Sequence, residues 1–119
     1  MTAGVAMKDG EVFRKTLIDL IAEKWGTFEA ESWAADYRLN WNDELSELMG
    51  NAVSDVSRVA QALKNKDDVE LCVAAGRART GFLDLSNFFR GIFDDFDALV
   101  REAEWQEIPD DYVYDKRIK

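Results

Sequence analysis

The fold is decided by residues 67–104, which read DDVELCVAAGRARTGFLDLSNFFRGIFDDFDALVREAE. Apolar side chains recur along one stripe of this stretch at alternating intervals of four and three residues, over more than four heptads. The stripe consists of Leu71, Ala75, Ala78, Phe82, Leu85, Phe89, Ile92, Phe96, Leu99 and Ala103. Such a pattern is typical of a helix that packs lengthwise against other helices. We therefore expect the rest of the chain to cover this stripe.

Three more helices are predicted before this stretch. Apolar residues at helical spacing predict a helix at 10–25, and Gly26 favours the left-handed backbone that ends it. A short helix is predicted at 28–38, where aromatic residues and alanine share a face. After a turn, Asn42 is predicted to cap a further helix, whose own four–three stripe covers 45–63.

The last helix is long enough to raise the question of a break. A continuous helix over 68–105 would measure about 57 Å. Glycines lie within it, each away from the apolar stripe. We expect a kink or break near Thr80–Gly81 or near Gly91–Asp95. The single proline, Pro109, ends the helical pattern.

These elements predict the architecture. A chain of 119 residues suggests one domain. We expect an all-α bundle of four to five helices over 1–119, ending in an acidic and aromatic tail at 109–119.

Residue composition removes several classes of function. The chain has no histidine, which excludes Ser-His-Asp and Cys-His catalysis and histidine-based zinc sites. The single Cys72 cannot form an internal disulfide, and we expect it to be a small buried side chain in a reducing cytosol. The aspartates at 94–97 fail the calcium-loop pattern, because Val100 stands where glycine is needed. We expect no metal, no cofactor and no catalysis.

Net charge and hydropathy indicate what the chain does not bind. A formal charge of −9 argues against direct affinity for nucleic acid or for anionic lipid. No window approaches the roughly 18 uncharged apolar residues that a membrane span needs. We expect a cytoplasmic protein without a membrane segment.

Acidic residues are concentrated near the C-terminus. Residues 94–115 contain nine acids against one base, Arg101, and aromatic residues lie among them. The predicted partner-binding residues are Asp94, Asp95, Asp97, Arg101, Glu104, Trp105, Glu107, Asp110, Asp111, Tyr112 and Tyr114. The alternative interpretation of the acids is a solvated helix face and a solubilising tail. The alternative interpretation of the aromatic residues is that the tail docks back on the bundle. Trp41, between two asparagines, is a further candidate interface anchor.

The leading hypothesis is a non-catalytic binding protein that occupies the basic, nucleic-acid-binding surface of a protein partner. Carboxylates spread along a helix imitate phosphate spacing and steer a cationic groove toward them. By class-level analogy, inhibitors of host defence carried by phages or mobile elements, such as anti-CRISPR and anti-restriction proteins, have this size and acidity. The alternative is a structural or assembly protein that pairs through its heptad-like stripes, for example as a homodimer.

Overall fold

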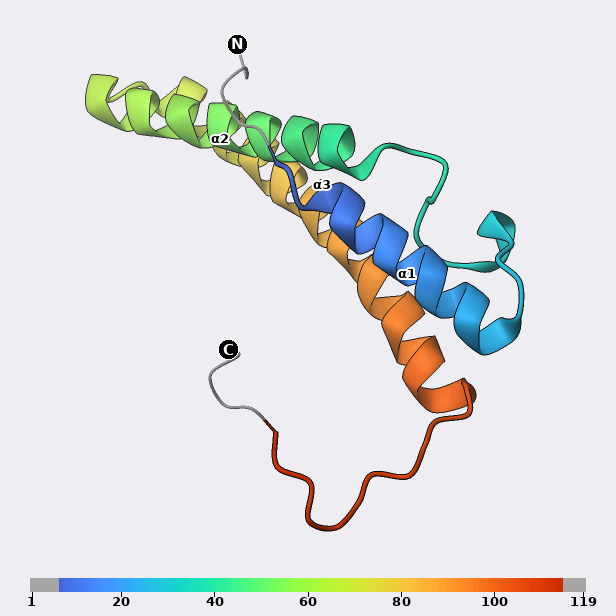
Figure 1. Cartoon of the computed structure of the whole chain (residues 1–119). Coiled ribbons are helices and arrows are strands. Elements are labelled where there is room, and N and C mark those ends of the chain that lie inside the picture. Colours follow the sequence, from blue (N-terminus) through green and yellow to red (C-terminus); the bar gives the residue numbers. More distant parts are fainter. Residues whose placement is uncertain (1–6, 115–119) are drawn as a thin grey trace.

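The computed structural model describes residues 7–114, and its regular structure over that range is entirely helical (Figure 1). Helix α1 spans Gly10–Trp25, a single 3-10 turn η1 spans Ala30–Ser32, α2 spans Trp41–Asn65 and α3 spans Asp68–Glu102. The all-α prediction is confirmed. The number of helices is not, because the described range contains three α-helices and not four or five.

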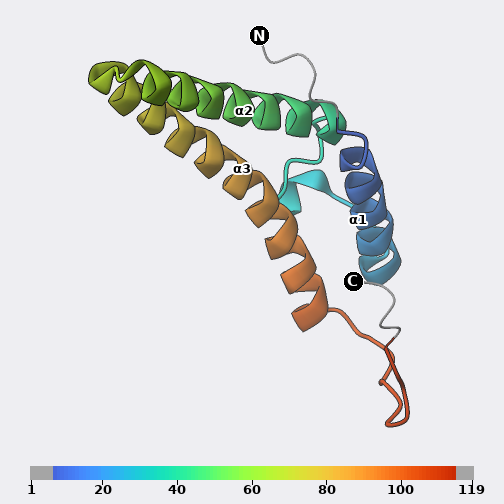
Figure 2. The same cartoon turned by 90° about the vertical axis from the view of Figure 1, so that its left-hand side faces the viewer.

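α2 and α3 form an antiparallel hairpin, and the third helix packs near its open end. Lys66 takes a left-handed conformation at the tip, and the Asp67 carboxylate accepts a hydrogen bond from the Glu70 N–H to start α3. Figure 2 shows α2 and α3 separating away from the tip, with α1 beside α2 and the 26–40 connection lying between α1 and α3. The tip half of the hairpin thus has no third helix against it.

The helix predicted at 28–38 does not form. That segment contains only the η1 turn, followed by extended residues and turns. The physical reason lies in the backbone hydrogen bonds: the N–H groups of Ala34 and Ala35 donate to the carboxylate of Asp95 on α3. A side chain 60 residues away in sequence thus satisfies donors that a helix would have satisfied internally.

α3 is continuous over Asp68–Glu102, so the predicted break is wrong. The glycines serve close approach instead. A Cβ atom added at Gly91 would lie 3.2 Å from the Ala35 Cα, and one at Gly81 would lie 3.5 Å from the Ala52 Cα. The 33–37 segment and α2 therefore approach the α3 backbone where glycine stands.

The core consists of two clusters. One contains Leu17 and Ile21 of α1, Tyr37, Trp41 and Leu99. The smaller cluster contains Leu45, Ala52 and Leu85 of the hairpin. Trp41, named from the sequence as a candidate interface anchor, is a core residue instead, because it is 1% exposed and its indole N–H donates to the Asp36 carbonyl at 2.8 Å.

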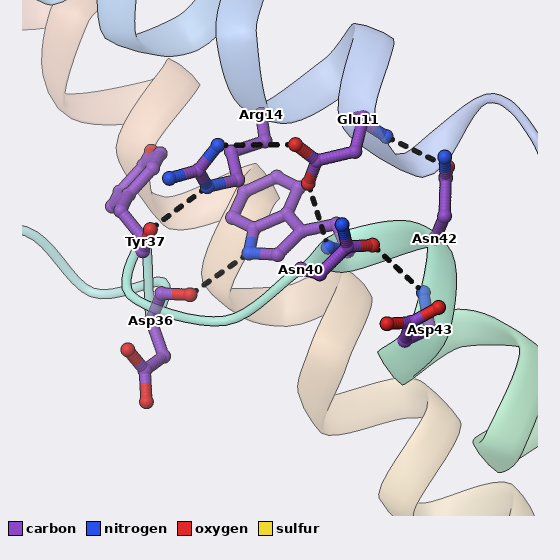
Figure 3. A network of polar contacts seen from close by, with 8 residues as sticks. Glu11, Arg14, Asp36, Tyr37, Asn40, Asn42 and Asp43 are labelled. Atoms are coloured by element: carbon purple, nitrogen blue, oxygen red, sulfur yellow. Dashed lines mark hydrogen bonds and ion pairs between the residues drawn. The ribbon is translucent and has the colours of Figure 1, made fainter.

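A polar network fastens α1 to the start of α2 (Figure 3). The Glu11 carboxylate accepts from the Trp41 N–H at 2.8 Å and pairs with Arg14, whose Nε donates to the Tyr37 carbonyl. The N-cap of α2 is Asn40, which accepts from the Asp43 N–H, and not Asn42 as predicted. Asn42 instead accepts from the Glu11 N–H. Asn40 therefore caps α2, whereas Asn42 accepts from the first turn of α1.

The long apolar stripe of α3 is covered along one edge only. Leu85 and Leu99 are buried against α2, α1 and the connection. By contrast, Phe82, Phe89 and Phe96 remain 52%, 44% and 41% exposed. Cys72 is also exposed, contrary to the expectation of burial. The three helices are too few to enclose the stripe.

Candidate protein-binding surface

Asp95 is not part of a surface. It is 2% exposed, and its carboxylate accepts hydrogen bonds from the Ala34 N–H at 2.7 Å, the Ala35 N–H at 3.0 Å and the Tyr37 hydroxyl at 2.8 Å. A buried carboxylate with three donors is a structural element. Its prediction as a partner-binding residue is wrong, because no partner can reach a side chain that is enclosed by the chain's own backbone.

The tyrosine in this contact is held in its neutral form. Burial, with the hydrogen bond to Asp95 as the second cause, raises the pKa of the Tyr37 phenol above its ordinary value. Its hydroxyl therefore remains a donor to the carboxylate throughout the neutral range. The ring packs edge-on to Phe28 and beside Trp41, with centroids 5.1 Å apart in both pairs.

The other predicted helix acids pair with bases on their own helix. Asp94 accepts from the Nε of Arg90 at 3.0 Å, and Asp97 accepts from the Nε of Arg101 at 3.0 Å. Both pairs have four-residue spacing and lie at the surface. Their charges are partly compensated, so this face of α3 is less acidic than its carboxylate count suggests.

The chain leaves α3 at a fixed point. The Trp105 indole N–H donates at 2.9 Å to the Leu99 carbonyl, which also accepts from the Ala103 N–H at 3.1 Å at the end of the helix. The Lys24 ammonium lies 4.2 Å from the centre of the Trp105 ring and donates to the Glu104 carbonyl at 2.9 Å. α1 therefore anchors the start of the C-terminal segment.

Beyond this anchor the chain extends away from the helices (Figure 1, in red). Residues 106–114 form no helix or strand, and the Tyr112 N–H closes one turn onto the Pro109 carbonyl at 3.1 Å. Every side chain from 104 to 114 is exposed. This set includes the predicted residues Glu104, Trp105, Glu107, Asp110, Asp111, Tyr112 and Tyr114. The last five residues of the predicted tail lie outside the described range.

A cleft of about 490 Å³ lies next to the anchor, on the side of the connection after α1. Two tryptophans, Trp25 and Trp33, pack edge to face with centroids 5.2 Å apart and line it. Glu29, Asp94 and Glu102 add carboxylates to its lining. Aromatic faces beside carboxylates suit a cationic side chain.

The structure thus divides the predicted site and adds to it. Asp95 is buried, Asp94 lines the cleft, and the residues from Glu104 onward form a separate exposed segment. Sequence reasoning missed the cleft because Trp25 and Trp33 come from segments far from α3 along the chain. Glu29 was visible only as an acid near a proposed helix start, a place where the helix dipole alone explains it.

Neither a metal centre nor a membrane helix is found in the part of the chain that the structure describes. Over residues 7–114 no three acidic or cysteine side chains gather as metal ligands would. Over the same range no helix combines the length and the apolar character needed to cross a bilayer. Compared with known proteins, the chain matches no family model, no curated protein and no solved structure.

Proposed function

We propose that the chain is a non-catalytic cytoplasmic binding protein that engages a basic surface of a protein partner. The observation that carries this proposal is the exposed segment 104–114, which contains four acids and no base. Aromatic and aliphatic side chains are interleaved with these acids, as in the anchors of protein interfaces. The segment begins at the Trp105 anchor, so its acids start from a defined position.

The cleft beside the anchor supports the same kind of partner. An arginine or lysine entering it meets the rings of Trp25 and Trp33 and the carboxylates of Glu29 and Glu102. Such a side chain gains cation–π and charge-assisted hydrogen bonds together. The segment and the cleft therefore favour one partner chemistry, a protein surface rich in arginine and lysine.

The narrower form of the proposal is inhibition of a nucleic-acid-binding protein. Surfaces that bind DNA or RNA concentrate lysine and arginine against phosphates. An acidic protein on such a surface competes with nucleic acid for the same lysine and arginine side chains. In this narrower form, the chain is an inhibitor of host defence of the anti-CRISPR or anti-restriction kind, encoded by a phage or mobile element.

The test is affinity capture with the full chain, from lysate of the source organism, with washes at low and at high salt. We expect a nucleic-acid-binding protein that is released by salt and by added DNA or RNA, because exposed charge contacts are screened. Capture that is indifferent to salt and to nucleic acid contradicts the proposal.

A matched pair of variants then locates the surface. Neutralising Glu107, Asp110 and Asp111 to their amides should weaken the captured complex about tenfold or more. Neutralising three exposed acids elsewhere changes the net charge equally and should have little effect. These control acids are Asp19, Glu23 and Glu47. Equal loss in both triple variants would mean that net charge, and not this segment, governs binding.

A further inference from the structure

The chain exposes more surface than a compact monomer. A globular protein of this mass exposes about 6,600 Å², whereas this chain exposes 9054 Å². Its radius of gyration is 19.2 Å, against about 13.5 Å for a compact chain of this length. The extended C-terminal segment accounts for part of the excess, and the uncovered flank of the hairpin for another part.

The uncovered flank is a single apolar face. At 100° of rotation per residue, Phe82, Phe89 and Phe96 lie about a quarter turn around α3 from the line of its buried residues, such as Leu85 and Leu99. On α2, Val53 and Val56 are displaced from the buried line by a similar angle, in the same rotational sense. Because the helices are antiparallel, the same sense brings both sets to one side of the hairpin. The face therefore extends across both helices.

We propose that this face binds a second copy of the chain, with the two α3 helices antiparallel about a two-fold axis beside Phe89. Phe82, Phe89 and Phe96 are spaced by seven residues. An axis at Phe89 sets Phe82 of each copy against Phe96 of the other, so the interface is self-complementary. This interface is separate from the acidic segment and does not depend on the function proposed for it.

The charge distribution along α3 selects the antiparallel orientation. Residues 71–90 contain three bases and one acid, whereas residues 91–102 contain one base and, besides the buried Asp95, three acids. A parallel pair would set base against base and acid against acid. An antiparallel pair sets the basic half of each copy beside the acidic half of the other.

One charge pair gives the register independently. Arg79 and Asp97 are 18 residues apart, which is about five full turns, so they lie on the same edge of the apolar face. In an antiparallel pair, like edges meet. The midpoint of the two residues, position 88, is one residue from Phe89, so an axis at Phe89 places Arg79 of one copy within two residues, about 3 Å, of the level of Asp97 of the other. The aromatic and charge patterns therefore agree.

The first experiment measures the mass of the full chain in solution by light scattering, at low and at high salt. A dimer that persists at high salt is expected, since apolar burial is not screened. Phe89→Glu should raise the dimer dissociation constant about tenfold or more. Leu83→Glu is the matched control, because Leu83 is 57% exposed on the same helix but lies off the face. A monomer at all concentrations, or equal effects of both variants, overturns the proposal.

Orientation is tested by disulfide formation in a Cys72→Ser background. Phe89→Cys should cross-link to itself, whereas Phe82→Cys and Phe96→Cys should cross-link only when mixed. Self-cross-linking of all three would indicate a parallel pair and overturn the proposed arrangement. Arg79→Glu should weaken the dimer, and adding Asp97→Arg should restore it. Retained helical circular dichroism shows that each variant is folded.

Discussion

Replacing Asp95 by asparagine should destabilise the fold severely although it changes only one atom of the side chain. One carboxylate oxygen accepts from the Ala34 N–H, and the other accepts from the Ala35 N–H and the Tyr37 hydroxyl. An asparagine keeps one acceptor and presents an NH₂ group where the second stood. The tyrosine hydroxyl can rotate to accept from that group, but the second backbone N–H is left facing a donor.

The magnitude follows from these three contacts. A hydrogen bond to a charged acceptor is worth about 1.5–3 kcal/mol, and a buried donor left unpaired costs about 1–3 kcal/mol. We expect Asp95→Asn to lower the free energy of unfolding by about 2–4 kcal/mol, because one bond is lost and the others become neutral. That is a large fraction of the roughly 5–15 kcal/mol that stabilises a domain.

Urea unfolding followed by tryptophan fluorescence measures this difference. The matched control is Asp94→Asn, one residue earlier, which breaks an exposed pair with Arg90 and should cost less than about 1 kcal/mol. A double-mutant cycle between Asp95→Asn and Tyr37→Phe should give a coupling of about 0.5–3 kcal/mol. Equal stabilities for Asp95→Asn and Asp94→Asn would refute the assignment of Asp95 as the buried acceptor of the connection.

Three further predictions follow from single contacts. Because the pKa of Tyr37 is raised in the folded state, the contribution of its neutral hydroxyl to stability is complete below a pH of about 10. Above that pH the contribution is lost at about 1.4 kcal/mol per pH unit. Urea titrations at alkaline pH should therefore show a smaller stability difference between the wild type and Tyr37→Phe. Gly76→Ala should raise the free energy of unfolding by about 0.5–1 kcal/mol, since no atom lies within 4 Å of the added Cβ; Gly91→Ala should lower it by about 1–3 kcal/mol, because its Cβ presses on the Ala35 backbone. Trp105→Phe removes one of the two donors to the Leu99 carbonyl, leaving the Ala103 N–H, and should lower the thermal midpoint slightly, by the equivalent of about 0.5–1.5 kcal/mol.

Periodicity predicted the helices well where the apolar pattern is long. α1 was placed at 10–25 and occupies Gly10–Trp25. The pattern at 45–63 lies within α2, and the pattern at 71–103 lies within α3 except for Ala103, which is the C-cap residue. Such patterns are local, because side chains three and four residues apart share a face whatever the rest of the chain does.

Predictions failed where a distant residue decides the local structure. The segment 28–38 has helical spacing of apolar residues, but its backbone donors are satisfied by Asp95. The glycines of α3 were interpreted as weak points, whereas the approach of Ala35 and Ala52 explains two of them. No pattern in a single sequence shows which segment approaches which glycine.

The candidate surface was predictable only in its composition. The concentration of acids near the C-terminus is a property of the sequence, and the exposed segment from Glu104 to Tyr114 contains seven of the eleven residues named from it. A carboxylate inside the fold and one outside it look alike in sequence, so Asp95 could not be distinguished from Asp94. The Lys24–Trp105 contact joins residues 81 positions apart and had no sequence signal.

Phe88 packs against both hydrophobic clusters, and its ring lies 5.5 Å from that of Trp41. The hairpin tip and the three-helix end of the protein are therefore connected through the Phe88 side chain. Whether these two parts unfold in one transition or in two depends on how strongly this packing couples them. Phe88→Ala should let the tip of the hairpin open while the three-helix end stays folded. Amide hydrogens near the tip should then exchange with solvent before those of the three-helix end.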